Sequence, residues 1–234
     1  MSRVIAVFGA GTGLGTSVAR RFAAEGFRVA LVARRKERLD ALVTRLAAEG
    51  IDVAGFTADL SRPAEIPALI AAIRGRFGRI DVIEYGPIGA EVAFTPAARL
   101  KPEALEKDIP LLLLTPVATV QAVLPEWTER GEGAFLMTTG HTAVAPRPHL
   151  SGVGPVMAAA RNYLYSLHGE LADSGIYAGT LSIAAMIERS EISEKIDADV
   201  LAGFPVVDPD ELAELYWRMY TKRDVVEQVH PEGA

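Results

Sequence analysis

Four glycines lie close together near the start of the chain, in the stretch Gly9-Ala10-Gly11-Thr12-Gly13-Leu14-Gly15. An apolar run over residues 3–8 precedes them and predicts a buried strand, and a helical pattern that stops at Gly26 follows. A turn without side chains lets backbone N–H groups approach a pyrophosphate, and the positive end of the next helix favours its charge. The turn is not a P-loop, because no Gly-Lys-Ser/Thr follows it. We therefore expect a phosphate cradle made by Gly9, Gly11, Thr12, Gly13, Leu14 and Gly15.

The residues after the second predicted strand (28–33) indicate which nucleotide is bound. The chain reads Arg34-Arg35-Lys36 there, and the first carboxylate is Glu37. A dinucleotide with a free adenosine ribose usually meets an Asp or Glu at this place, whereas a guanidinium is the better partner for a 2′-phosphate. The same lack of an acid argues against S-adenosylmethionine. We predict NADP(H) rather than NAD(H), held by Arg34 and Arg35; the alternative is a solvated basic turn.

Strands and helices must alternate to position these residues. Further strands are predicted at 53–58, 80–85, 134–138 and 177–183, and helices at 66–77, 109–124, 154–172 and 210–220. Strict alternation is typical of a single-domain, Rossmann-type α/β fold, a doubly wound parallel sheet with helices on both faces. We expect one domain over residues 1–234. Its ligands should lie beyond the carboxyl ends of the strands, where the glycine turn is.

Over nearly its whole length the chain resembles the short-chain dehydrogenase/reductase family. The resemblance rests on the glycine turn, on Asp59-Leu60 after the third strand, and on the helix segments 121–125 and 167–171. It implies that Asp59 receives the adenine amino group, with the backbone of Leu60 beside it. The family's Asn-Asn-Ala-Gly stretch reads Tyr85-Gly86-Pro87-Ile88 here, which places Gly86 among the cofactor-binding residues. Phe8 stands where the family usually has Thr.

The catalytic residues of that family are not matched. Its Tyr-x-x-x-Lys pair falls on Val153 and Met157, its serine on or near Thr139, and its asparagine near Leu112. The tyrosine protonates the alkoxide that hydride transfer creates, and the lysine lowers the pKa of that phenol. Loss of a general acid alone costs about 10²–10⁴ in rate. The usual ketone/alcohol mechanism cannot run on a valine and a methionine.

Two functions remain open. The first is an NADP(H)-dependent oxidoreductase with a non-standard site, in which Thr139 donates a hydrogen bond, His141 supplies the proton, and Tyr85 borders the crevice, as do Glu84 and His149. A substrate that is already positive, such as an iminium, would need no acid. The second is a non-catalytic NADP(H)-binding protein, a sensor or subunit partner. In such a protein His141 would cap a turn, and Tyr85 would fill the space that the asparagines of the family's Asn-Asn-Ala-Gly stretch occupy.

Composition limits the remaining possibilities. The 234 residues are half hydrophobic, contain no cysteine and carry a net charge of −6, which gives no reason to expect a nucleic-acid partner. The four histidines show no ligand spacing, so we expect no metal site. The first strand begins at once, without a signal peptide, and the apolar segment 109–124 is shorter than the roughly 20 residues of a membrane span. We expect a cytoplasmic protein that does not enter a membrane.

The end of the chain carries two further expectations. Residues 188–205 mix charges with apolar side chains and predict a short amphipathic helix that serves as a substrate lid. Residues 222–234 are polar and are expected to fray. The family resemblance also implies a homo-oligomer, a dimer or tetramer that pairs through the apolar helices near residues 109 and 154. The identity of the small-molecule substrate does not follow from the sequence.

Overall fold

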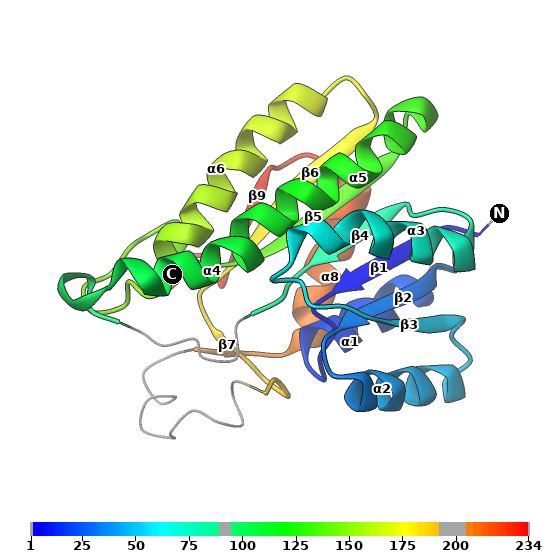
Figure 1. The fold of residues 1–234 in the computed structure, drawn as a ribbon, viewed down its shortest axis with the longest axis horizontal. Coiled ribbons are helices and arrows are strands. Elements are labelled where there is room, and N and C mark those ends of the chain that lie inside the picture. The colour runs from blue at the N-terminus through cyan, green and yellow to red at the C-terminus, as the bar shows by residue number, and fades with distance from the viewer. Residues whose placement is uncertain (1, 89–94, 192–204, 234) are drawn as a thin grey trace.

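A computed structural model of the protein describes residues 2–88, 95–191 and 205–233. Seven strands form one sheet in the order β3-β2-β1-β4-β5-β6-β9, and each neighbouring pair is parallel (Figure 1). The winding reverses between β1 and β4, and ligands of such sheets bind in the crevice at that point. The predicted parallel sheet is confirmed. Its strands are β1 (Val4–Phe8), β2 (Arg28–Ala33), β3 (Val53–Thr57), β4 (Val82–Tyr85), β5 (Gly133–Gly140), β6 (Ile176–Ile183) and β9 (Glu227–His230).

Helices cover both faces of the sheet, as the alternating pattern predicts. One face carries α1 (Leu14–Ala23), α2 (Lys36–Ala48) and α8 (Pro209–Lys222). The other carries α3 (Ile66–Phe77), α5 (Thr115–Arg130) and α6 (Gly154–Leu171) (Figure 1). Strands β1 and β4 are buried along their whole length between these two layers. Short 3₁₀ turns lie at Pro63–Glu65 (η1), Ala97–Arg99 (η2) and His141–Ala143 (η4).

The helix predicted at 109–124 is longer than expected. Helix α4 (Pro102–Ile109), a π turn η3 (Pro110–Leu114) and α5 form one helical run over 102–130. In the π turn the N–H of Thr115 donates to the carbonyl of Pro110, five residues back. Pro116 has no N–H to give to the next carbonyl, that of Leu111, and the hydroxyl of Tyr85 donates to it instead. By length and composition this run could cross a membrane; in the fold it packs beside α3 and α6.

Residues 227–230 do not fray, contrary to the expectation for the polar tail. These residues form β9, which pairs with β6 at the edge of the sheet. The segment is polar, but Glu227 is held by an ion pair with Arg161 of α6, which satisfies its charge at a side-chain exposure of 7%. The predicted lid at 188–205 is bounded by a two-stranded sheet, β7 (Met186–Ile187) and β8 (Val206–Val207). Most of that lid, residues 192–204, lies outside the described residues.

Candidate active site

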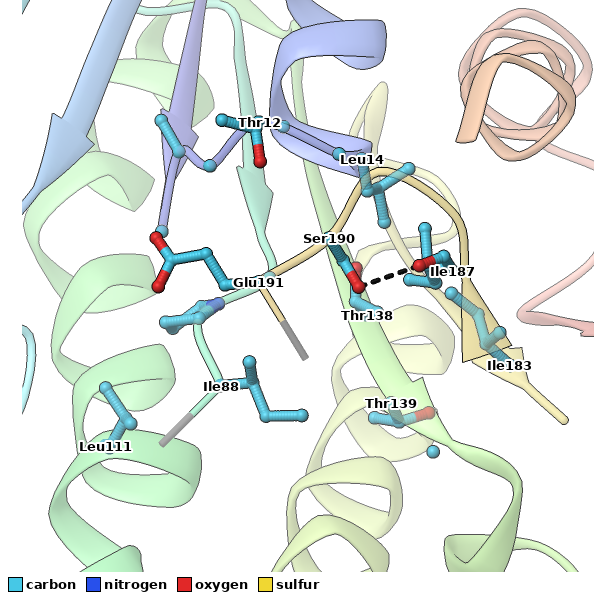
Figure 2. A pocket seen from close by; sticks show the side chains of 18 of the residues that line it. Thr12, Leu14, Ile88, Leu111, Thr138, Thr139, Ile183, Ile187, Ser190 and Glu191 are labelled. Carbon is cyan, nitrogen blue, oxygen red and sulfur yellow. Dashed lines mark hydrogen bonds between the residues drawn. The ribbon is translucent and has the colours of Figure 1, made fainter. Parts of the chain in front are cut away.

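A cleft of about 1250 Å³ opens at the carboxyl ends of the central strands (Figure 2). Typical small-molecule sites occupy roughly 300–1,000 Å³, so this cleft has room for a dinucleotide and a small substrate together. It lies where the winding of the sheet reverses, as the sequence predicts. Its walls come from the ends of the six strands β1 to β6 and from α1, α2 and α6. They include residues 9–15, 33–35, 38, 39, 41, 42, 45, 58–61, 86–88, 138–142, 153, 157 and 183–187.

The glycine turn packs directly against the segment that follows β4. Gly9 has a φ of 91°, and its N–H donates to the carbonyl of Val32 at 2.9 Å. A Cβ on Gly9 would lie 2.6 Å from the Cα of Pro87, so only glycine fits this approach. Gly13 precedes α1, and no side chain caps that helix, which leaves its amino end available to a phosphate. All six residues predicted for the cradle line the cleft: Gly9, Gly11, Thr12, Gly13, Leu14 and Gly15.

Four arginines line one end of the cleft. Arg34 and Arg35 follow β2, as predicted, and Arg38 and Arg45 come from α2. The sequence analysis missed the last two, although their spacing of seven places them on one face of a helix. Arg35 and Arg38 both form ion pairs with Glu191, the second at 2.6 Å. A 2′-phosphate would find at least three guanidinium groups here.

The residues predicted to lie at the adenine, Asp59 and Leu60, also line the cleft. Asp59 accepts hydrogen bonds from the Ser61 hydroxyl at 2.7 Å and the Ser61 N–H at 3.0 Å. These bonds hold the pKa of Asp59 below its usual value, against the opposing effect of burial. The carbonyl of Leu60 accepts from the hydroxyl of Thr115 at 2.7 Å, which ties this loop to α5. Gly86 lines the cleft at the end of β4.

A buried acid lies beneath Gly86. Glu84 is 1% exposed, and its Oε1 accepts from the Thr138 hydroxyl at 3.0 Å. The same hydroxyl lies 2.6 Å from the hydroxyl of Tyr216 on α8. Burial raises the pKa of Glu84 to about 8, so the carboxyl is protonated at neutral pH. Thr138 lines the cleft and separates the acid from it. The sequence analysis placed Glu84 near the crevice but did not find its partners, which come from other elements.

Two apolar side chains, Val153 and Met157, line the cleft; the sequence resemblance predicted the family's tyrosine and lysine at these two positions. Val153 immediately precedes α6, and Met157 lies one turn into it. The sulfur of Met157 accepts a hydrogen bond from the N–H of Gly140 at 3.2 Å. Gly140 is the last residue of β5, so this thioether satisfies the end of the strand. Neither Val153 nor Met157 can deliver a proton.

Thr139 is held by a chain of hydrogen bonds that leads away from the cleft. Its hydroxyl lies 2.7 Å from that of Ser182, which donates to Glu227 at 2.6 Å. Burial alone would raise the pKa of Glu227, but hydrogen bonds from Arg161 and Ser182 outweigh it and leave that pKa below its usual value. Because Ser182 gives its proton to this carboxylate, it must accept the proton of Thr139. Thr139 is therefore oriented as an acceptor toward any group in the cleft, and the expected donor role is not supported.

His141 is the titratable side chain predicted for proton delivery, and it lines the cleft. It begins the 3₁₀ turn η4 and is 9% exposed. Its carbonyl accepts from the N–H groups of Val144 and Ala145 at 2.8 and 2.9 Å, which fixes the backbone of the turn. His149, eight residues later, does not line the cleft. In the described part of the chain, acidic and histidine side chains form no group that could hold a metal.

The expectation that Tyr85 borders the crevice is wrong. Tyr85 is 1% exposed, packs between Phe8 and Phe135, and is absent from the cleft wall. Its hydroxyl donates a hydrogen bond to the carbonyl of Leu111 in the π turn. Burial raises the pKa of Tyr85 well above its usual value. The side chain is therefore a structural support for the helix that the family's asparagine would occupy, and not a proton donor.

Comparison with known proteins gives matches over most of the chain. Residues 3–200 match the short chain dehydrogenase family. An oxidoreductase of Sarocladium schorii, asL5, is 31% identical over 192 residues, which cover 81% of this chain and 75% of the relative. An alcohol dehydrogenase of Thermococcus sibiricus complexed with 5-hydroxy-NADP is 25% identical with a TM-score of 0.78, over 97% of this chain and 95% of that structure.

A third similarity concerns the fold alone. A short chain oxidoreductase of Pseudomonas aeruginosa, described as containing an atypical catalytic center, has a TM-score of 0.83 at 20% identity. The superposition covers 97% of this chain and 94% of that structure. The two structural similarities each cover 97% of this chain.

Proposed function

Because the chain belongs to the short chain dehydrogenase family, we propose that it is an NADP(H)-dependent oxidoreductase whose proton donor is not a tyrosine. One observation carries the cofactor assignment: the glycine cradle and the arginines Arg34, Arg35 and Arg38 line the same cleft. The cradle fits a pyrophosphate, since its glycines carry no side chains and no side chain caps the amino end of α1. When bound, NADPH supplies a hydride. The complex of the Thermococcus sibiricus relative supports this assignment.

His141 is the proposed proton donor. It lines the same cleft as Val153, where the family's phenol is expected, and histidine is the side chain that most often transfers protons in active sites. Thr139 and Met157 do not compete for this role, because the first gives its proton to Ser182 and the second carries none. An acceptor that is already cationic would need no donor, so imines belong among the first substrates to test.

The cofactor assignment is tested by titrating the protein with NADPH and NADH. We expect NADPH to bind at least about tenfold more tightly, since charge-assisted bonds contribute roughly 1.5–3 kcal/mol each. Arg34→Ala should weaken NADPH much more than NADH. Arg218→Ala removes the same charge from an exposed site on α8 outside the cleft and serves as the control. No NADPH binding at tens of micromolar would contradict the proposal.

Turnover is tested separately from binding. Stopped-flow oxidation of NADPH with panels of ketones, imines and activated alkenes should show a reaction that His141→Ala slows by about 10²-fold or more. His149→Ala, in the same connection between β5 and α6 but outside the cleft wall, should leave the rate unchanged. If His141→Ala has no effect on ketone reduction, the histidine is not the donor.

A non-catalytic NADP(H)-binding protein is the second candidate. The observation that favours it is the apolar pair Val153 and Met157, together with a Thr139 hydroxyl whose proton points away from the cleft. Tight NADPH binding without oxidation by any acceptor class would support this function and contradict the enzyme.

Self-association is a further part of the proposal. Leu114 in the π turn is 45% exposed, and Tyr165 on α6 is 38% exposed. These positions lie on the helices through which we expect two copies to pair. Size-exclusion chromatography with light scattering should give a mass above the 25.0 kDa of one chain. A monomer would contradict this part alone.

A further inference from the structure

Glu191 lines the same cleft as Arg35 and Arg38. Figure 2 shows it next to Ser190, on the segment that follows β7. It forms ion pairs with both Arg35 and Arg38, the latter at 2.6 Å. Its side chain is 27% exposed, whereas those of Arg35 and Arg38 are 54% and 58% exposed. The carboxylate is therefore the most enclosed member of the group, and the two guanidinium groups close around it.

The backbone that carries Glu191 is fixed beside the glycine turn. The hydroxyl of Thr12 donates to the carbonyl of Arg189 at 2.8 Å. A Cβ on Gly13 would lie 3.2 Å from the carbonyl oxygen of Glu188, so this segment and the turn are in close contact. Arg189 in turn pairs with Asp210 at 3.0 Å, at the start of α8. These contacts tie the position of Glu191 to the phosphate cradle itself.

A carboxylate and a phosphate monoester are alternative ligands of the same guanidinium groups. Both are anions that accept paired hydrogen bonds from arginine, and two such anions at one site repel each other. A 2′-phosphate that binds Arg35 and Arg38 must therefore separate them from Glu191. A dinucleotide with a free 2′-hydroxyl brings no second anion and requires no such exchange.

We propose that Glu191 is a specificity-determining residue, an internal competitor for the 2′-phosphate that reduces the preference of the site for NADP(H) over NAD(H). The inference rests on the proposed cofactor function and concerns its selectivity. The preference is the difference between the gain from the phosphate–arginine bonds and the loss of two carboxylate–arginine pairs. Along the chain the first acid after β2 is Glu37, whereas the fold brings Glu191 to Arg35 and Arg38 from a segment about 150 residues later.

The test uses two nucleotide fragments that differ in the phosphate: adenosine 2′,5′-bisphosphate and adenosine 5′-diphosphate. Their dissociation constants are measured by calorimetry on the full-length protein, on Glu191→Gln and on Glu188→Gln. The second variant removes the same charge from the same segment, at an exposed residue outside the cleft wall. Thermal unfolding of each variant verifies that it is folded.

We expect Glu191→Gln to bind the 2′,5′-bisphosphate about three- to tenfold more tightly than the wild type, as the loss of exposed ion pairs implies. Its affinity for the diphosphate should change less than twofold, and Glu188→Gln should keep the wild-type ratio. An unchanged or weaker affinity of Glu191→Gln for the 2′,5′-bisphosphate overturns the inference and leaves the proposed function intact. If neither fragment nor NADPH binds any of the three proteins, both are overturned.

Discussion

The sulfur of Met157 accepts a hydrogen bond from the backbone N–H of Gly140 at 3.2 Å. In the family pattern this helix position carries a lysine, whose charge would act on a phenol at Val153. Here the position closes the end of β5 instead, inside an apolar cluster with Leu112 and Val156. Met157 thus completes the packing and the hydrogen bonding of the strand end.

Replacing Met157 should therefore affect stability rather than cofactor binding. Met157→Leu keeps the volume but removes the sulfur acceptor, so we expect a loss of about 1 kcal/mol in the free energy of unfolding. Met137→Leu is the matched control, because that methionine of β5 is equally buried, in the core between the sheet and α3, α5 and α6, and in the described part of the chain its sulfur accepts no hydrogen bond from the backbone. Urea denaturation of both variants measures the difference. Equal losses would show that the contact with Gly140 contributes nothing.

The glycine turn allows a sharper test of the cradle. Gly9→Ala would combine a φ of 91° with a Cβ only 2.6 Å from Pro87, and we expect it to cost about 3 kcal/mol or more. At Gly11 the nearest atom to an added Cβ is 4.0 Å away, so Gly11→Ala should cost less than about 1 kcal/mol. Thermal unfolding compares the two. A Gly9→Ala protein as stable as Gly11→Ala would show that the turn is not packed against the end of β4.

The buried carboxyl of Glu84 should make the free energy of unfolding depend on pH. Its pKa rises from an ordinary 4.5 to about 8 in the folded protein, so the folded state holds a proton that the unfolded chain has lost. Its contribution to stability is full below pH 4.5 and is lost as the pH rises toward 8, by up to about 1.4 kcal/mol per pH unit. Urea denaturation between pH 5 and 8 should show this slope in the wild type, reduced in Glu84→Gln. Parallel curves for the two proteins would mean that Glu84 is ionised.

The chain from Thr139 to Ser182 can be tested by a double-mutant cycle. Thr139→Val removes the donor and Ser182→Ala the acceptor, and their combined effect on unfolding should fall short of additivity by about 1 kcal/mol. Thr138→Val combined with Ser182→Ala is the control, because the Thr138 hydroxyl bonds Glu84 and Tyr216 instead. That pair should be additive to within about 0.5 kcal/mol. Additivity in both cycles would rule out the chain to Glu227.

The sequence was most informative where a contact is local. Glycine spacing around Gly9 and the arginines after β2 identify the cradle and the basic end of the cleft, because each belongs to a single strand-turn-helix unit. Alternating apolar periods likewise give the parallel sheet. The strand β9 was missed because its residues are polar and its burial depends on an ion pair between Glu227 and Arg161, which are distant in sequence.

The rest of the site depends on contacts between remote segments. Tyr85 was predicted to border the cleft because it ends β4. Its hydroxyl instead donates to Leu111 in the π turn, whose carbonyl lacks a backbone partner because Pro116 has no N–H. From the sequence, Glu191 was predicted to belong to a substrate lid. Its ion pairs with Arg35 and Arg38 appear only in the folded structure. Periodicity assigns a residue to a face of an element, but it does not say which distant polar atom lacks a partner there.

Thr138 and Thr139 are neighbours on β5, and the pleat of the strand directs their hydroxyls to opposite layers of the molecule. The hydroxyl of Thr138 donates to Glu84, which keeps its proton. The hydroxyl of Thr139 connects through Ser182 to Glu227, which is ionised. The width of one strand thus separates the protonated carboxyl of Glu84 from the ionised carboxylate of Glu227. Each can be changed by point substitution without disturbing the other, whereas a one-residue slip in the pairing of β5 would exchange them.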